Sequence, residues 1–122
     1  MYMDQRNIKM VEYTGNDFYC DVAFKNIKDL KVEFENNNVL AYHHTHPFWS
    51  VHIVVVPKKH IPSFTVRNDG DDEIILEVLD VVKNMASKIE TSHGECRIMT
   101  NVGNYQDSKH LHIHVYSGEQ IR

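Results

Sequence analysis

The clearest hydrophobic periodicity in the chain runs from Asp71 to Glu90 and predicts an amphipathic α-helix. Apolar residues recur there at intervals of three and four positions, and acidic residues crowd the first turn. Gly94 follows the pattern and predicts the C-cap of this helix. A shorter helical segment is predicted from Asn16 or Asp17, which are both good N-cap residues, to about Lys25.

Alternating and continuous apolar runs predict five β-strands, over residues 31–35, 39–43, 51–57, 96–101 and 110–116. The first two are joined by Asn36-Asn37-Asn38, whose turn chemistry predicts a hairpin. The strand that ends at Pro57 is apolar on both faces, as expected of a central strand. Two helices and five strands predict an α+β fold, and 122 residues leave room for only one domain over 1–122.

Composition narrows the possible functions. The chain has 13 Lys plus Arg against 17 Asp plus Glu, a net charge of −4 that excludes the broad basic field of a non-specific nucleic-acid binder. The longest apolar run, Ile53 to Val56, is too short to cross a bilayer, which takes about 20 residues as a helix. Residues 1–9 show no signal-peptide pattern, and Cys20 and Cys96 have no paired spacing. We therefore expect a reduced, cytoplasmic protein without membrane association.

Histidine is the unusual component, because the chain contains nine. Three of them alternate in His110-Leu111-His112-Ile113-His114, so on a strand they share one face while Leu111 and Ile113 point into the core. The pattern allows a merely polar strand face, a metal site, or acid-base and nucleophilic catalysis. Strand positions i and i+4 are roughly 13 Å apart, so His110 and His114 cannot easily share an ion. Two adjacent histidines with an outside ligand could.

Phosphoryl chemistry suits a row of imidazoles best. A neutral imidazole can attack phosphorus to form a covalent intermediate, while a neighbouring imidazolium stabilises charge and protonates the leaving group. The five glycines assemble neither G-x-x-x-x-G-K nor G-x-G-x-x-G, so any phosphate has to be held in another way.

The segment from His110 to Tyr116 resembles the histidine triad (HIT) motif, His-φ-His-φ-His-φ-φ. Upstream, Leu40-Ala-Tyr-His43, Pro47 and the run from Val51 through Pro57-Lys-Lys-His60 to Ile61 also resemble the HIT domain. Asn101-x-Gly103 with Gln106 lies where that family has its phosphate-side loop. From about residue 18 to residue 120 the chain is similar to the Hint-like branch of nucleoside phosphoramidases.

The resemblance implies a five-stranded antiparallel sheet with two helices, a homodimer with a joined ten-stranded sheet, and hydrolysis or transfer of a nucleoside monophosphate, commonly AMP. It implies His112 as nucleophile, His114 against the phosphoryl and leaving groups, His110 as an orienting residue and His60 as the fourth active-site histidine. Asn101 and Gln106 would contact the phosphate. No metal or other cofactor takes part in this chemistry.

Several positions depart from the family pattern. His44 stands where the family has the acidic residue that holds the ribose hydroxyls, and it can satisfy only one hydrogen bond there. Asp107 replaces a phosphate-facing serine, so we expect it to turn away or to pair with Lys109 or a histidine. Some relatives bind zinc through Cys-x-x-Cys and two histidines, but Cys20 is followed by Ala23, so we expect that site to be absent or incomplete.

Two further expectations concern specificity and the other histidines. The chain ends at Arg122 without the tail of Hint-like proteins, and Glu119 replaces a basic residue, so leaving-group specificity should differ. The segment from His43 to His46 is expected to be a solvated, partly ribose-facing turn. The alternative functions are dinucleoside polyphosphate hydrolysis, a catalytically weak nucleotide-binding module, and a metal binder that uses His43, His44 or His46 with the triad strand.

Overall fold

The computed structural model describes residues 2–3, 12–13 and 15–122. Its centre is a five-stranded antiparallel sheet in the order β3-β4-β5-β7-β6. The strands are β3 (Val32–Glu35), β4 (Val39–His43), β5 (Trp49–Pro57), β6 (Arg97–Met99) and β7 (Ile113–Gln120). Strands β1 (Tyr2–Met3) and β2 (Glu12–Tyr13) form a separate antiparallel pair. The predicted α+β class, with a five-stranded sheet and two helices, is confirmed.

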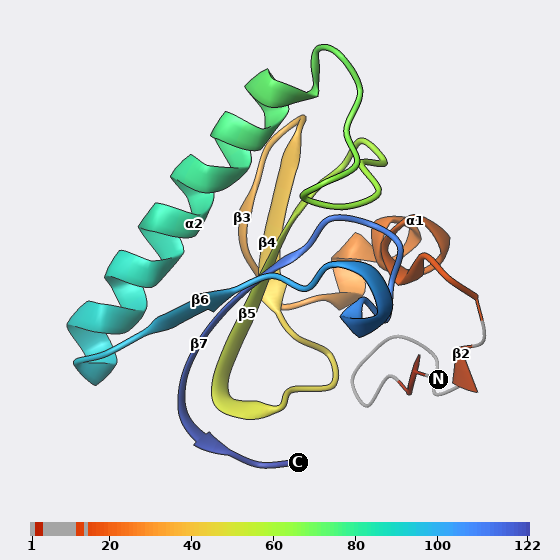
Figure 1. Ribbon diagram of the computed structural model, residues 1–122. Coiled ribbons are helices and arrows are strands. Elements are labelled where there is room, and N and C mark those ends of the chain that lie inside the picture. The colour runs from red at the N-terminus through yellow and green to blue at the C-terminus, as the bar shows by residue number, and fades with distance from the viewer. Residues whose placement is uncertain (1, 4–11, 14) are drawn as a thin grey trace.

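Helix α2 (Asp71–His93) packs its apolar stripe on one face of the sheet (Figure 1). It ends where the periodicity predicts, at Gly94, whose φ of 85° favours glycine and whose N–H bonds to the carbonyl of Glu90. Strands β4, β5 and β7 supply the facing core residues, among them Ala41, Val55 and Val115. None of the helices among the described residues is long and apolar enough to span a membrane.

Helix α1 (Phe18–Asp21) lies against the opposite face of the sheet (Figure 1) and is shorter than predicted. The chain continues as two 3-10 turns, η1 (Ala23–Lys25) and η2 (Ile27–Asp29). The side-chain amide of Asn26 donates to the carbonyl of Val22 at 2.7 Å, an alternative to a helical bond, which explains the early end. Phe18 and Tyr19 are buried against β4 and β5 in a second core.

The triad segment enters the sheet later than predicted, because β7 begins at Ile113 rather than at residue 110. The N–H of Leu111 bonds to the carbonyl of Ile61, and the carbonyl of His112 accepts from Thr100, so these backbone groups contact loops instead of β6. Strand β6 is correspondingly short, and the 3-10 turn η3 (Gly103–Tyr105) follows it. The alternation still holds, since Leu111 and Ile113 pack into the apolar clusters near α2.

Candidate active site

His112 is held in one tautomer by its own segment of backbone. Its Nδ1 lies 2.7 Å from the carbonyl oxygen of His110, which can only accept, so Nδ1 carries the proton. The lone pair of a neutral imidazole is then on Nε2. Burial lowers the pKa of His112, because only 5% of the residue is exposed. His112 therefore offers an unprotonated nitrogen at neutral pH.

His114 is fixed from the other side, through His52 on β5. The N–H of Phe48 donates to His52 Nδ1 at 3.1 Å, which leaves the proton of a neutral His52 on Nε2. His52 Nε2 lies 2.8 Å from His114 Nδ1 and donates to it, so the proton of His114 is on Nε2. Burial lowers the pKa of His52 to about 4 and that of His114 to about 3, so both imidazoles are neutral at pH 7.

His44 completes this group, which we call the His52 cluster (His44, His52 and His114). The His44 ring stacks on the His52 ring with 4.4 Å between centroids, and its Nδ1 accepts the N–H of His46 at 3.0 Å. The expectation of a solvated turn is wrong at its centre, because His44 and Thr45 are buried. The N–H of His44 bonds to the carbonyl of His52 and draws this part of the turn inward.

The His52 cluster does not offer a metal the lone pairs it needs, although ligand atoms of its three rings lie within 4.8 Å of one another. In both His44 and His52 a backbone N–H occupies Nδ1, and the proton is therefore on Nε2. A cation at either nitrogen would displace an amide donor or a proton. The structure thus gives no support to a metal binder built from His44 and the triad strand.

A second group, the Asp17 cluster (Asp17, Cys20, His60 and His110), lies against helix α1. The Nε2 of His110 is 2.8 Å from the carbonyl oxygen of Pro57 and donates to it, so the Nδ1 of a neutral His110 carries a lone pair. This Nδ1 lies 3.2 Å from Asp17 Oδ2 and 3.6 Å from Cys20 Sγ. His60 Nδ1 lies 2.6 Å from Asp17 Oδ2 and 3.9 Å from Cys20 Sγ.

The charges of the Asp17 cluster follow from its hydrogen bonds. Burial opposes ionisation of Asp17, but the side-chain contact and charge of a protonated His110, together with the hydrogen bond from the N–H of Cys20, outweigh it and hold the pKa of this carboxyl well below its usual range. Burial and the neighbouring Asp17 raise the pKa of the Cys20 thiol to about 11. An ionised carboxylate thus faces two imidazoles and a thiol.

The sequence model of the HIT domain matches residues 25–121. This chain belongs to the HIT family. An uncharacterized HIT-like protein from Buchnera aphidicola subsp. Baizongia pistaciae (strain Bp) is 26% identical over 99 residues, which cover 80% of this chain and 88% of the relative.

Solved structures of HIT proteins share the fold. A HIT family hydrolase from Legionella pneumophila Philadelphia 1 is 31% identical with a TM-score of 0.70, covering 88% of this chain and 96% of that one. A histidine triad protein from Clostridium difficile is 27% identical with a TM-score of 0.71, covering 91% and 97% of the two chains. The chain therefore has the fold of HIT family hydrolases.

Some HIT proteins bind zinc, and the donor atoms of the Asp17 cluster can be compared with the ligands that zinc requires. A tetrahedral zinc ion binds N, O and S ligands at about 2.0–2.3 Å, which places neighbouring donors about 3.3–3.8 Å apart. The four donor atoms here all lie within 4.8 Å of one another. Ala23 stands where a Cys-x-x-Cys motif that begins at Cys20 would have its second cysteine, whereas the fourth donor, Asp17, lies three residues before Cys20. One carboxylate, one thiol and two imidazoles suit zinc.

His60 and His110, expected at the catalytic centre of this HIT protein, both belong to the Asp17 cluster. The contacts of His60 are with Asp17, Cys20 and the ring of His110. At the other end of the triad, His114 is contacted by His52, a histidine for which the sequence predicted no role. In the alternation of β5, His52 shares a face with the apolar residues Val54 and Val56, which give no sign of a polar partner.

The loop between β6 and the triad carries the predicted phosphate contacts. Gln106 is buried and its amide donates to the carbonyl of Pro62 at 2.8 Å, so part of its donor capacity holds the loop. Asn101 is half-buried and directly follows Thr100, whose hydroxyl donates to the His112 carbonyl at 2.7 Å. The loop is therefore tied to the backbone of His112.

Asp107 is exposed, and its negative charge raises the pKa of His112 against the effect of burial. Of the alternatives expected for Asp107, the pairing with Lys109 is not found, and the exposed carboxylate fits the alternative that it turns away. The ammonium of Lys109 donates instead to the carbonyls of Gly103 and Gln106, and Asp107 makes no ion pair within the part of the chain that the structure describes.

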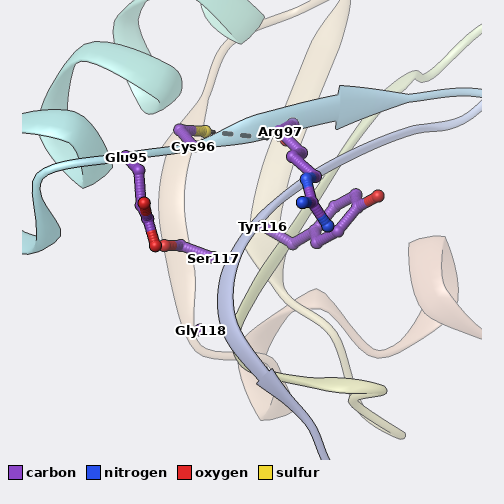
Figure 2. Close-up of a pocket in the computed structure, with 6 residues that line it drawn as sticks. All are labelled: Glu95, Cys96, Arg97, Tyr116, Ser117 and Gly118. Carbon is purple, nitrogen blue, oxygen red and sulfur yellow. Dashed lines mark hydrogen bonds between the residues drawn. The ribbon is translucent and has the colours of Figure 1, made fainter.

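Aromatic rings border the His52 cluster at its far end. Trp49 stacks on Tyr116 with 3.8 Å between centroids and meets the His52 ring edge-on at 5.0 Å. Beyond Tyr116 lies a cavity of about 170 Å³ (Figure 2), lined by Glu95, Cys96, Arg97, Tyr116, Ser117 and Gly118. No histidine lines it, so we assign the chemistry to the two clusters and not to this cavity.

Proposed function

We propose that this protein is a HIT-type hydrolase or transferase that releases a nucleoside monophosphate, with AMP as the expected product, from a phosphoramidate or related conjugate. The observation that carries the proposal is the pair of fixed tautomers at His112 and His114. A lone pair on His112 Nε2 adjoins a ring whose Nε2 carries a proton, and the two ring centroids are 5.0 Å apart. One ring is suited to attack and the other to donate.

The reaction proceeds in two displacements. His112 Nε2 attacks phosphorus, the P–N bond to the leaving amine breaks, and its electron pair goes to the amine nitrogen, which takes a proton from His114. Because His114 is neutral before substrate binds, this proton enters with the anionic phosphate, which favours the imidazolium form. Water then attacks phosphorus, a proton returns to His114, and the P–N bond to His112 breaks with its electron pair returning to Nε2.

The remaining predicted residues act around these two rings. His110 orients His112, because its carbonyl accepts the Nδ1–H of the nucleophile. Asn101 and Gln106 are proposed on the phosphate side, and His44 on the ribose side in place of a carboxylate. A neutral imidazole that accepts at Nδ1 has at most one N–H to donate, whereas a carboxylate can accept from both ribose hydroxyls. We therefore expect weaker discrimination for ribose.

The test is a substrate panel that varies base and leaving group, run on wild type and on His112→Ala. We expect nucleoside monophosphate release from an AMP phosphoramidate by the wild type and loss of turnover by at least about 10³-fold in the variant, as for loss of a nucleophile. Intact-protein mass after rapid alkaline quenching should show one nucleotidyl group on the wild type only. His93→Gln, an exposed histidine at the end of α2, is the matched control and should keep full activity.

Each other outcome identifies an alternative. Turnover that survives His112→Ala would contradict the mechanism. Faster cleavage of a diadenosine polyphosphate than of the phosphoramidate would favour dinucleoside polyphosphate hydrolysis. Tight nucleotide binding without turnover on any leaving group would indicate a binding module, an alternative that the burial of His112 makes worth testing.

We also propose that the protein forms a homodimer, and the support is the edge of the sheet at β6. Strand β6 is the last strand in the order, and Ile98 at its centre is 56% exposed. An unpaired edge strand with an apolar side chain is suited to pair with a second copy. Sedimentation analysis should show a dimer for the wild type and a monomer for Ile98→Lys. A monomeric wild type would contradict it.

A further inference from the structure

Trp49 contacts the histidine face of the sheet, although the alternation of β5 predicts the opposite face for it. Val51 and Ile53, two and four positions further along, pack in the core beneath α2, and strict alternation would direct Trp49 the same way. The register of β5 against β7 shifts between Trp49 and Val51. Trp49 consequently stacks on Tyr116, with 3.8 Å between centroids, and meets the His52 ring edge-on.

The register shift depends on a glycine in β7. Gly118 has a φ of 89°, a backbone conformation that favours glycine. A Cβ at this position would collide with the hydroxyl of Ser50, which donates to the carbonyl of Ser117 at 3.4 Å. Glycine at 118 therefore permits the close approach of β5 and β7 beside Trp49.

The turn that precedes Trp49 is held on two sides. The N–H of Phe48 donates to His52 Nδ1 at 3.1 Å, and the carbonyl of Phe48 accepts the N–H of Ile121 at 2.8 Å. The guanidinium of Arg122 donates to the carbonyl of the residue before Phe48 at 2.6 Å. A ring that is already fixed loses little conformational entropy when a ligand stacks on it. Trp49 is thus preorganised for such a contact.

The accessible surface of this ring pair belongs to Trp49. Because β7 lies between β5 and β6, Tyr116 has Trp49 on one side and its cross-strand neighbour Arg97 on the other. The side chains of Arg97 and Tyr116 extend from the strands in the same direction (Figure 2). Tyr116 is buried, whereas Trp49 is only partly buried.

Trp49 borders the two rings that serve the leaving group in the proposed reaction. His114 protonates the leaving amine, and His52 donates to His114 at 2.8 Å. The Trp49 centroid lies 5.0 Å from that of His52, and Tyr116 follows His114 on the same face of the strand, at about 7 Å. An in-line displacement places the leaving nitrogen on the far side of phosphorus from His112. A substituent on that nitrogen therefore extends away from the nucleophile and toward Trp49.

We propose that Trp49, stacked on Tyr116, forms a leaving-group subsite that favours nucleoside phosphoramidates whose amine carries an aromatic ring. The inference rests on the proposed function and names the substrate class of the same site. Indole presents a broad flat face on which an aromatic ring gains a stacking contribution beyond the burial of its area, and a saturated ring of similar size does not. The subsite is separate from the ribose side, because His44 stacks on His52 with 4.4 Å between centroids, whereas Trp49 meets His52 edge-on.

The test compares two conjugates of AMP that differ in the ring of the amine, the N-benzyl and the N-cyclohexylmethyl phosphoramidate. We expect the ratio of their kcat/KM values to be about 5-fold higher for the wild type than for Trp49→Leu, which keeps an apolar side chain but removes the ring. Adenosine 5′-phosphoramidate, which has no substituent, normalises each variant for changes in the chemical step. Phe64→Leu removes an aromatic ring that is 48% exposed in the loop after His60, and this control should keep the wild-type ratio.

A merely structural role of Trp49 would lower the rates for both conjugates equally. Equal ratios in the wild type and Trp49→Leu would therefore overturn the subsite and leave the proposed function standing. Absence of turnover by the wild type on all three substrates would instead contradict the proposed function.

Binding of the intact conjugates to His112→Ala tests the subsite without turnover. Calorimetry should show that adding Trp49→Leu to His112→Ala weakens binding of the benzyl conjugate about 5-fold more than binding of the cyclohexylmethyl conjugate. Nuclear Overhauser contacts between the benzyl ring and the Trp49 indole are expected in His112→Ala, and they decide the question if Trp49→Leu does not fold. Equal losses of affinity, or a bound benzyl conjugate without these contacts, would overturn the proposal.

Discussion

Two histidine clusters flank His112, and they differ in the backbone group that each ring contacts. In the His52 cluster, amide N–H groups donate to His44 and His52. In the Asp17 cluster, the carbonyl of Pro57 accepts from His110. An amide leaves the proton on the far nitrogen of the ring, whereas a carbonyl leaves a lone pair there. The far nitrogen of a neutral ring is therefore a hydrogen-bond donor in the His52 cluster and an acceptor in the Asp17 cluster.

This comparison shows that counting histidines within reach of one another does not identify a metal site. Both clusters bring their ligand atoms within 4.8 Å. Only the Asp17 cluster also contains an anionic oxygen and a thiol, which can balance the charge of a cation. The His52 cluster consists of three imidazoles whose pKa values burial lowers, and it is suited to pass a proton to a substrate.

Among the variants that compare the two clusters, the largest expected effect is at His52, whose Nε2–H donates to His114. His52→Phe keeps the ring volume but removes the N–H that donates to His114 Nδ1. We expect kcat to fall about 100-fold, the lower range for loss of proton-transfer assistance. Nitrogen NMR should show His114 with its proton on Nε2 in the wild type and a mixture of tautomers in the variant.

His60→Gln is the comparison variant, since it changes a histidine of the Asp17 cluster. We expect weaker Zn²⁺ binding and a kcat within about 10-fold of the wild type, because His60 contacts neither His112 nor His114 in the contacts described above. A loss in His60→Gln equal to that in His52→Phe would restore the prediction that His60 is the fourth catalytic histidine.

The pH dependence of stability separates the two clusters in the metal-free protein. The folded pKa values of His52 and His114, about 4 and about 3, lie below the ordinary value of 6.5, so the unfolded chain takes up protons first as pH falls. The free energy of unfolding should therefore fall between pH 6.5 and 4, by up to roughly 3 kcal/mol for each of the two rings. His44 and His112 face these rings and add to the fall in the same direction.

The pKa of Asp17 is lowered, so its contribution is present above its ordinary value of 3.8 and is lost only below that pH. Urea unfolding at a series of pH values measures both ranges. His52→Phe should flatten the slope between pH 6.5 and 4, and Asp17→Asn should leave that slope in place. The reverse assignment of slopes would contradict the separation.

The smallest expected change in stability is at Thr100, whose hydroxyl connects the phosphate-side loop to the backbone of His112. Thr100→Val removes the hydroxyl that donates to the His112 carbonyl at 2.7 Å, and we expect the free energy of unfolding to fall by about 1 kcal/mol. Thr91→Val, the same change at an exposed position of α2, is the control and should be nearly neutral. Equal losses in both variants would show that the Thr100 bond contributes nothing.

Local patterns predicted most of the fold. The periodicity of α2, its glycine C-cap and the hairpin around Asn36-Asn37-Asn38 are confirmed, because each depends on residues close in sequence. The shared face of the triad was also predictable from alternation. The early end of α1 was not, because it depends on the side chain of Asn26, and the late start of β7 depends on loop contacts to Leu111 and His112.

The site was predictable only in part. The role of His52 depends on its pairing with His114 across two strands, and an apolar run on both faces of β5 gives no sign of it. The local sequence predicts Asp17 as an N-cap, and the structure confirms this role. Nothing in the local sequence indicates that the second carboxylate oxygen of Asp17 also contacts His110, 93 residues away. Hydrogen bonds between distant segments decide which nitrogen of each histidine is free.

Trp49 gives the protein an optical property that follows from its stacking position. It is the chain's one tryptophan, and its ring lies between Tyr116 and the edge of His52. An imidazolium quenches a neighbouring indole far more than a neutral imidazole does. Protonation of His52 should therefore quench the tryptophan emission, and a stopped-flow pH jump that follows this emission would time the arrival of that proton.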